Sequence, residues 1–437
     1  MLKDNNSIIV VDNNEKDLQD IAGVFNLHGI GCRTIECDGF NLLSKPLKGI
    51  KLAFFDINFT DAGDTTAILS ALRSVFASTI SKDNGPFVLV FWTTNSQMVN
   101  DFMTFVNRDD TYKQLPKPIY ITTLDKTKFV AQPEHLMDAI DAIYSSPLVK
   151  CLFTFNEELQ KASDDCMNNI TSLINVDEPW GQSTKFENCF KEIFSKISID
   201  TLGMINGRQH PDESIKESLS PLFLYNLCNN GSTVWKEYLK LEQLEEKYLK
   251  GIDIKKIAPS LNTYYHIDPN VTDIFARGVV RFINADSDEF KNRTGFEKNV
   301  WVNDRFLNKQ HVFQNDYHIV ALEYSAACDY SNNKNRLHKF MMGILCKEED
   351  AEKIKNKKKY IGEHLYVLEF TFIYNDEKCV LVLDLNSTFN EEDGEVFKLL
   401  SKPLFKLKHE IMNVITTKHA NHESRLGFSY FRYLSSR

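Results

Sequence analysis

The chain has 437 residues and a formal net charge of −9, from 51 lysines and arginines against 60 aspartates and glutamates. At roughly 100–200 residues per domain, this length predicts two or three domains. With 43% apolar and 25% charged residues the composition is globular, which excludes disordered, collagen-like and coiled-coil architectures, and the acidic balance argues against nucleic acid as the main partner.

Residues 1–146 alternate between strand-like and helix-like segments. The β-branched apolar run at residues 7–11 is typical of a strand buried on both faces, and Leu18, Ile21, Ala22 and Phe25 then recur at helical spacing. Further strands are expected over residues 31–36, 51–57, 87–93 and 118–124, and further helices over residues 40–47, 65–80, 99–106 and 133–144. Five β/α units in this order predict a doubly wound α/β domain, with a five-stranded parallel sheet that helices cover on both faces.

Residues 147–260 have helical periodicity throughout. The expected helices cover residues 155–174, 186–199, 212–228 and 233–250. The last helix is rich in leucine, glutamate and lysine. It fits either an oligomerising helix or an ordinary packed helix, because it is too short for a clear heptad pattern.

Strand-like segments return in residues 261–437, which we expect to form an α+β domain. A turn at residues 375–377 predicts a hairpin between the last two strands. The expected strands cover residues 278–283, 317–324, 340–346, 365–374 and 378–385, and the expected helices cover residues 391–400 and 404–418.

The length of the apolar segments and the spacing of the cysteines predict where in the cell the protein is found. No window reaches about 18 uncharged apolar residues, and no signal-peptide core follows the N-terminus, so we expect no association with a membrane. The nine cysteines are scattered and form no Cys-x-x-Cys pair. In a chain of this size they indicate reduced thiols and therefore a cytoplasmic protein.

Polar residues of related chemistry follow four strands of the first domain. Asp12 ends the first strand and Asp56 the third, while Thr93 ends the fourth and Lys126 follows the fifth. Ligands of parallel α/β sheets sit at the carboxyl ends of the strands, and no Gly-rich phosphate loop is present there. Two clustered carboxylates can share Mg²⁺, and a carboxylate beside a cation can attack a phosphoryl donor to form an acyl phosphate. These residues therefore predict a phosphoryl-transfer site.

With these residues, the first domain resembles the receiver domain of two-component response regulators. The resemblance implies that Asp56 accepts a phosphoryl group from a cognate sensor histidine kinase. It also implies that Thr93 is the switch hydroxyl and Lys126 the ammonium that contacts the phosphoryl group. Mg²⁺ would be held by Asp12, by Asp56 and by the backbone carbonyl of Asn58.

The sequence departs from the receiver pattern at two positions. Asn13 stands where the family has a second acid, which is the closer metal ligand there, so Mg²⁺ binding should be weaker and phosphotransfer slower. Thr127 stands where receivers commonly have proline. Lys128 and Thr94 are therefore alternatives for the ammonium and the hydroxyl. The other interpretation is a pseudo-receiver, kept for dimerisation or docking without phosphorylation.

Three clusters in the C-terminal domain could carry chemistry. Cys328 could be a nucleophile with His338 as its base, or a metal ligand with Cys346, and the alternative is a buried structural cysteine. Asp384 emerges from a strand but lacks the Glu-x-Lys partner of a nuclease. The third cluster consists of His409, His419 and His422. It fits either a metal site or the solvent-exposed end of a helix. No hydrolase, metalloprotease, Walker or kinase motif occurs, so no motif indicates an enzyme beyond self-phosphotransfer and autodephosphorylation.

The combination of a divergent receiver with a long tail resembles receiver proteins of bacterial phage-defence loci such as the Detocs system. Residues 326–330 (Ala-Ala-Cys-Asp-Tyr) and 422–425 (His-Glu-Ser-Arg) carry the resemblance of the tail. In that system a sensor kinase feeds two receivers, one with a nucleotide-destroying effector and one that acts as a phosphate sink. Because no nucleoside-phosphorylase-like effector is recognisable here, the resemblance implies the sink. Asn58, two residues after Asp56, leaves room for water to hydrolyse the acyl phosphate, which suits a sink.

Three functions stay open at this point. The first is a phosphoacceptor that buffers a defence kinase. A second receiver protein, which carries the effector, would receive phosphoryl groups from the same kinase. The second is a regulator whose C-terminal region is an effector or partner-binding module switched by Asp56. The third is an enzyme that uses the neighbourhood of Cys328 or Asp384. The oligomeric state, with a homodimer among the options, stays open as well.

Overall fold

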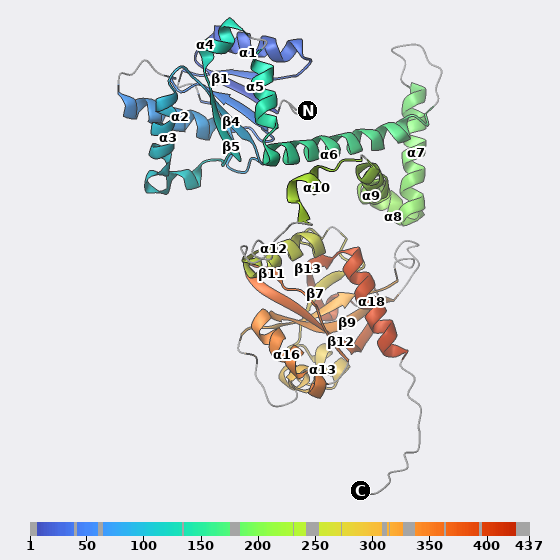
Figure 1. The fold of residues 1–437 in the computed structure, drawn as a ribbon. Coiled ribbons are helices and arrows are strands. Elements are labelled where there is room, and N and C mark those ends of the chain that lie inside the picture. Colours follow the sequence, from blue (N-terminus) through green and yellow to red (C-terminus); the bar gives the residue numbers. More distant parts are fainter. Residues whose placement is uncertain are drawn as a thin grey trace. The chain divides into compact units, whose positions relative to one another are not determined.

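The computed structural model describes residues 7–38, 42–59, 64–132, 135–174, 184–229, 231–241, 253–271, 273–307, 313, 315–326, 337–361, 364–392 and 396–424. The chain divides into two compact units (Figure 1). Residues 1–169 and 223–244 form the first unit, and residues 170–222 and 245–437 form the second.

The first unit is built on a parallel sheet, which has five strands in the described part of the chain. The strand order is β2-β1-β3-β4-β5, and every neighbouring pair is parallel. The strands are β1 (Ile8–Asp12), β2 (Arg33–Glu36), β3 (Leu52–Phe55), β4 (Val88–Trp92) and β5 (Tyr120–Leu124). The connection order reverses between β1 and β3, so a topological switch point lies at the carboxyl ends of these two strands.

Helices cover both faces of this sheet. On one face, α1 (Glu15–Leu27) and α5 (His135–Tyr144) share a core with alternate residues of the central strands. On the other face, α2 (Thr65–Thr79) and α3 (Ser96–Asn107) form a second core with the remaining strand residues. The strands are apolar on both sides because both sides are covered. The predicted α/β class and its five-stranded parallel sheet are confirmed.

Two connections differ from the prediction. The helix expected over residues 40–47 is wrong in its described part, because residues 42–47 form no helix and Leu47 instead makes a parallel bridge with Ile80. Pro46, directly before that bridge, cannot donate a backbone hydrogen bond to a helix. A short helix that was not predicted, α4 (Lys126–Ala131), begins at Lys126 with Asp125 as its N-cap. A 3₁₀ helix, η1 (Arg108–Gln114), precedes β5.

Helices then continue along the chain. They are α6 (Pro147–Thr171), α7 (Thr184–Leu202), α8 (Met204–Gln209), α9 (Pro211–Asn229) and α10 (Val234–Leu239). The helix expected over residues 233–250 is wrong in its described part, because Lys240 adopts the left-handed conformation with φ 45° and ends α10. Residues 242–250 lie outside the described part. None of the described helices combines the length and the apolar character needed to cross a membrane.

The second unit contains an antiparallel sheet, to which the described residues contribute eight strands. The order is β10-β12-β9-β8-β7-β13-β6, with β11 paired to β12. The strands are β6 (Ile267–Asp268), β7 (Val279–Ile283), β8 (His318–Glu323), β9 (His338–Lys347), β10 (Leu365–Val367), β11 (Phe372–Tyr374), β12 (Glu377–Glu391) and β13 (Leu400–Leu407).

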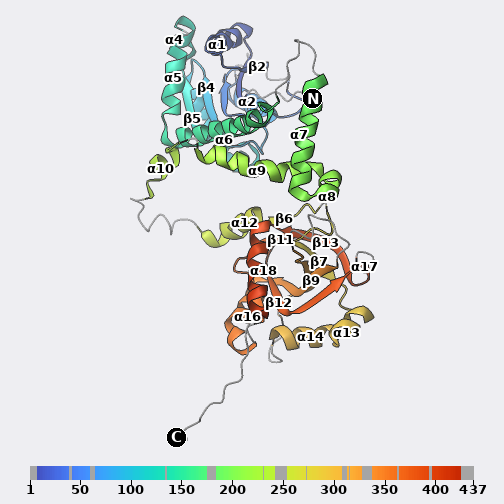
Figure 2. The same cartoon turned by 90° about the vertical axis from the view of Figure 1, so that its right-hand side faces the viewer.

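Several helices pack on this sheet around a single large core. Figure 2 shows α18 lying along the sheet, where Met412 and Ile415 are buried. The helical elements are α12 (Ile254–His266), α13 (Asp288–Thr294), α14 (Lys298–Val302), a π-helical turn η3 (Asn303–Leu307), α16 (Glu348–Ile361), α17 (Val396–Leu399) and α18 (His409–Glu423).

The C-terminal predictions are partly correct. The hairpin turn is confirmed, since Asn375 and Asp376 join β11 to β12 with φ 49° and 62°, the left-handed pair that a tight type I′ turn requires. The strand expected over residues 365–374 is wrong at residues 368–371, which separate β10 from β11. The helices expected over residues 391–400 and 404–418 are wrong at their starts. Glu391 ends β12, and Leu400–Leu407 is a strand that pairs with β7. This distant pairing overrides the local helical spacing.

Candidate functional site

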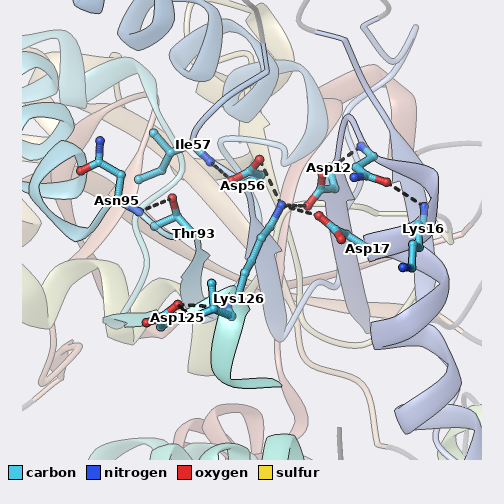
Figure 3. Close-up of polar contacts among 11 residues, drawn as sticks. Asp12, Lys16, Asp17, Asp56, Ile57, Thr93, Asn95, Asp125 and Lys126 are labelled. Atoms are coloured by element: carbon cyan, nitrogen blue, oxygen red, sulfur yellow. Dashed lines mark hydrogen bonds and ion pairs between the residues drawn. The ribbon is translucent and has the colours of Figure 1, made fainter. Parts of the chain in front are cut away.

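Lys126 lies between three carboxylates at the carboxyl edge of the parallel sheet (Figure 3). Its Nζ atom is 2.6 Å from Asp12 Oδ2, 2.9 Å from Asp17 Oδ2 and 3.2 Å from Asp56 Oδ2. Asp12 is the last residue of β1, and Asp56 directly follows β3. Parallel strands end at the same edge, which explains why residues so far apart in the sequence meet here.

The two strand-end carboxylates are held in the same way. Asp12 Oδ1 accepts a hydrogen bond from the backbone N–H of Asn14 at 2.9 Å, and Asn14 in turn caps α1 by accepting from the N–H of Lys16 at 3.0 Å. Asp56 Oδ1 accepts from the N–H of Ile57 at 2.7 Å. In each carboxylate, one oxygen is fixed by the backbone and the other faces the ammonium.

Burial governs the ionisation of these groups. Burial and the neighbouring Asp56 raise the pKa of Asp12 to about 6, while Lys126 and the Asn14 amide oppose that rise. Burial likewise raises the pKa of Asp56 against the effects of Lys126 and of the backbone amides of Ile57 and Asn58. Burial alone would lower the pKa of Lys126, but its carboxylate neighbours outweigh burial and raise it. With three carboxylates around one ammonium, the site carries excess negative charge that a further cation would neutralise.

The site fits a Mg²⁺ ion bound by carboxylates and water. Asp12 Oδ2 is buried and pairs with Lys126, and a carboxylate oxygen has a second lone pair with which it can bind a hard cation. The described residues contain no group of three or more His, Cys, Asp or Glu side chains placed to hold a metal. Mg²⁺ commonly takes one or two carboxylates together with water and substrate phosphate. Asp12 and Asp56 would be those two ligands.

Thr93 directly follows β4 and is buried. Its Oγ1 accepts a hydrogen bond from the N–H of Asn95 at 3.1 Å. Figure 3 shows Thr93 and Asp12 on opposite sides of Asp56. The alternative hydroxyl, Thr94, is exposed, so Thr93 is the threonine that reaches the interior beside the site.

The other predicted site residues occupy the surface. Asn13 and Asn58 are both exposed. The alternative lysine, Lys128, is also exposed, whereas the side chain of Lys126 is only 12% exposed. The structure therefore brings Asp12, Asp56 and Lys126 together and leaves the two asparagines at the rim.

Asp17 also belongs to the site, although no sequence pattern predicted it. It is the third residue of α1 and accepts a hydrogen bond from Lys126 Nζ. The Cα–Cβ bonds of a helix tilt toward its N-terminus, which directs this side chain back toward the end of β1. Acidic residues are common in the first turn of a helix because they interact favourably with the helix dipole. The position of Asp17 in the sequence therefore did not indicate a role in the site.

The first C-terminal cluster is only partly described. Cys328 lies outside the described residues, and Cys346 is buried in β9. His338 is buried at the start of β9, with Nδ1 3.5 Å from Glu323 Oε1 and its ring stacked on Phe275. Glu323, the last residue of β8, is thus the charged neighbour of this histidine.

The other two C-terminal clusters have local structural roles. Asp384 accepts hydrogen bonds from the N–H of Asn386 and the hydroxyl of Ser387, which together form the bulge of β12 opposite β9. The histidines have separate neighbours. His419 packs against Tyr324, His422 Nε2 lies 2.7 Å from Asn386 Oδ1, and His409 is the first residue of α18.

No protein-family model matches this chain, and a search of curated proteins finds no match either. Similarity therefore shows no family, and the functional conclusion depends on the geometry at the strand ends.

Proposed function

We propose that the first unit is a receiver-type phosphoacceptor, in which Asp56 takes a phosphoryl group from a sensor histidine kinase. One observation carries this proposal. Asp12 Oδ2 and Asp56 Oδ2 face the same ammonium of Lys126, a side chain only 12% exposed, at the switch point of a β2-β1-β3-β4-β5 sheet. Ligand sites of such sheets lie at this position.

The proposed step is a phosphoryl transfer between side chains. A carboxylate oxygen of Asp56 attacks the phosphorus of a phosphohistidine, a P–O bond forms, and the P–N bond breaks as the imidazole nitrogen keeps the electron pair and takes up a proton. Lys126 balances the charge of the phosphoryl oxygens, and the Thr93 hydroxyl is available as a donor to one of them. Bound Mg²⁺ would supply further charge neutralisation at those oxygens.

The buffering role rests on what surrounds Asp56. Asn58 is exposed two residues further along. In the proposed role, its small amide would leave room for a water molecule to attack the acyl phosphate. Repeated hydrolysis would drain phosphoryl groups from a kinase. We therefore propose that the chain acts as a phosphate sink in a bacterial phage-defence relay, in which the kinase also feeds a second receiver that carries the effector.

A phospho-switched regulator is the second candidate. The observation that favours it is the large second unit, whose antiparallel sheet has its own extensive core. A sink does not need such a unit, whereas a regulator needs an output module.

Intact mass and Phos-tag electrophoresis test phosphorylation itself. After incubation with the cognate kinase and Mg²⁺, the wild type should gain one phosphoryl group and Asp56→Ala should gain none. Asp20→Asn, a carboxylate change on α1, is the matched control and should behave as the wild type. An unmodified wild type, which is the pseudo-receiver outcome, or equal modification of Asp56→Ala would contradict the proposal.

Growth in cells separates the two roles. Expressed with an active kinase and effector in the absence of phage, Asp56→Ala should be toxic if the chain is a sink, because the effector then receives all the phosphoryl groups. Normal growth together with loss of an output would favour the regulator.

A further inference from the structure

We infer that Asp17 is a positioning residue of the phosphotransfer site and acts by holding the Lys126 ammonium beside Asp56. This inference rests on the proposed function and adds to it a residue that lies on α1, outside the strand ends. Its basis is the hydrogen bond that Lys126 Nζ donates to Asp17 Oδ2 at 2.9 Å.

Both partners of this hydrogen bond are mostly shielded from water. The Lys126 side chain is 12% exposed and the Asp17 side chain 18% exposed. The bond joins the first turn of α1 to the first residue of α4, across 109 positions of sequence. A charge-assisted hydrogen bond in such a place is stronger than an exposed ion pair.

Asp17 differs from the other two carboxylates in what happens during transfer. Asp12 and Asp56 face the ammonium with the oxygens that a cation or a phosphoryl group would engage, so their contacts with Lys126 change as the site fills. Asp17 belongs to neither strand end, and its contact can persist. A lysine has a flexible stem with about 2 kcal/mol of rotamer entropy, so one constant partner keeps its ammonium in place through the transfer.

Asp17 also supplies a negative charge that the uncharged Asn13 does not. Asn13 is exposed and uncharged, so it does not supply the second acid that a receiver-type site would use. The carboxylate of Asp17 enters the same cluster from one turn further along the chain. The site thus keeps a third negative charge next to Lys126.

The test is the rate of a single phosphorylation turnover at saturating Mg²⁺ in the full-length chain, with the cognate kinase or acetyl phosphate as the donor. Asp17→Asn should slow transfer by about tenfold, as loss of one hydrogen bond between charged groups does. Asp20→Asn, the control on the same helix, should leave the rate unchanged, and Asp17→Glu should recover most of it.

A double-mutant cycle shows whether Asp17 acts through Lys126. If it does, Asp17→Asn combined with Lys126→Gln should be as slow as Lys126→Gln alone, with circular dichroism confirming that each variant is folded. Multiplied effects of the two substitutions, or an unchanged rate in Asp17→Asn, would overturn the inference while leaving the proposed function intact. An unphosphorylated wild type would overturn the proposed function and the inference with it.

Discussion

At the scale of single residues, Asp12 makes stability depend on pH. Its pKa rises from the ordinary 3.8 to about 6 in the folded chain. Between these values the folded state binds more protons than the unfolded state, so stability falls as pH increases through this window and levels off above it. We expect the first unit to be roughly 2 kcal/mol less stable at pH 7.5 than at pH 4 on account of this group. Urea unfolding at both pH values should show a smaller difference in Asp12→Asn, and equal differences would refute the assignment.

Bound Mg²⁺ should offset the loss of stability that the ionisation of Asp12 causes as pH rises. Only the ionised carboxylate is a good ligand, so added Mg²⁺ should raise the melting temperature of the first unit more at pH 7.5 than at pH 5. Differential scanning fluorimetry with Mg²⁺ alone measures this. The increase should disappear in Asp12→Asn and persist in Asp20→Asn. A Mg²⁺ effect that is independent of pH would contradict a role for Asp12 as ligand.

The residues of the site were predictable to different degrees. Asp12 and Asp56 follow short apolar strands directly, so parallel topology alone brings them together. Successive residues at the end of a strand point to opposite sides, so only one of Thr93 and Thr94 faces the interior. Which of the two does so is clear only once the end of β4 is known. Asp17 was not predictable, because its role depends on where Lys126 reaches after β5, and only the folded chain specifies that position.

At the scale of elements, the pairing of β9 with β12 leaves no space at Gly343. A Cβ atom there would lie 2.4 Å from the carbonyl oxygen of Val382 and 3.0 Å from a methyl group of Leu383. Backbone atoms of a paired strand cannot move cheaply, so Gly343→Ala should destabilise the second unit by about 1–3 kcal/mol.

Gly23→Ala is the matched control for this substitution. Gly23 lies within α1 and a Cβ atom there would meet nothing within 4 Å, so the change should stabilise the first unit by up to about 1 kcal/mol. Hydrogen exchange of the amides of β9 and α1 reports each unit separately. Similar protection of β9 in Gly343→Ala and in the wild type would contradict the packing described.

Elements governed by local chemistry were the more predictable ones. The turn at Asn375 and Asp376 depends on two adjacent residues that tolerate positive φ, and it was predicted. Strand β13 was missed because its partner, β7, lies more than a hundred residues earlier and Pro403 interrupts its pattern. The bulge of β12 at Asp384 similarly reflects pairing with β9 across the sheet.

At the scale of the whole molecule, the core of the first unit extends beyond the five β/α segments. Val149 and Phe153 of α6 are buried with residues of β1 and α1, and the ring of Phe153 lies 5.3 Å from that of Tyr144. Helical periodicity predicts that a helix forms here but does not say which core it joins. The division of the chain into two units, with boundaries after residues 169, 222 and 244, therefore depends on packing that no local pattern encodes.

Phe153→Ala tests the contribution of α6 to this core. Removal of a buried phenylalanine should destabilise the first unit by about 3–5 kcal/mol. Met167→Ala, at a position 40% exposed on the same helix, should change stability by less than about 1 kcal/mol. Hydrogen exchange in β1 and β3 measures both effects. Equal effects of the two substitutions would show that α6 is not part of the core.

The 2.7 Å hydrogen bond from the Ile57 amide to Asp56 also provides a reporter for solution studies. This N–H is shielded, since Ile57 is fully buried, and it points at an oxygen whose charge would change with protonation, cation binding and acylation. The resonance frequency of an amide responds strongly to the charge on its acceptor. A single cross-peak in a nitrogen–proton correlation spectrum should therefore distinguish these occupancies of the site, without an added label and without separation of the species.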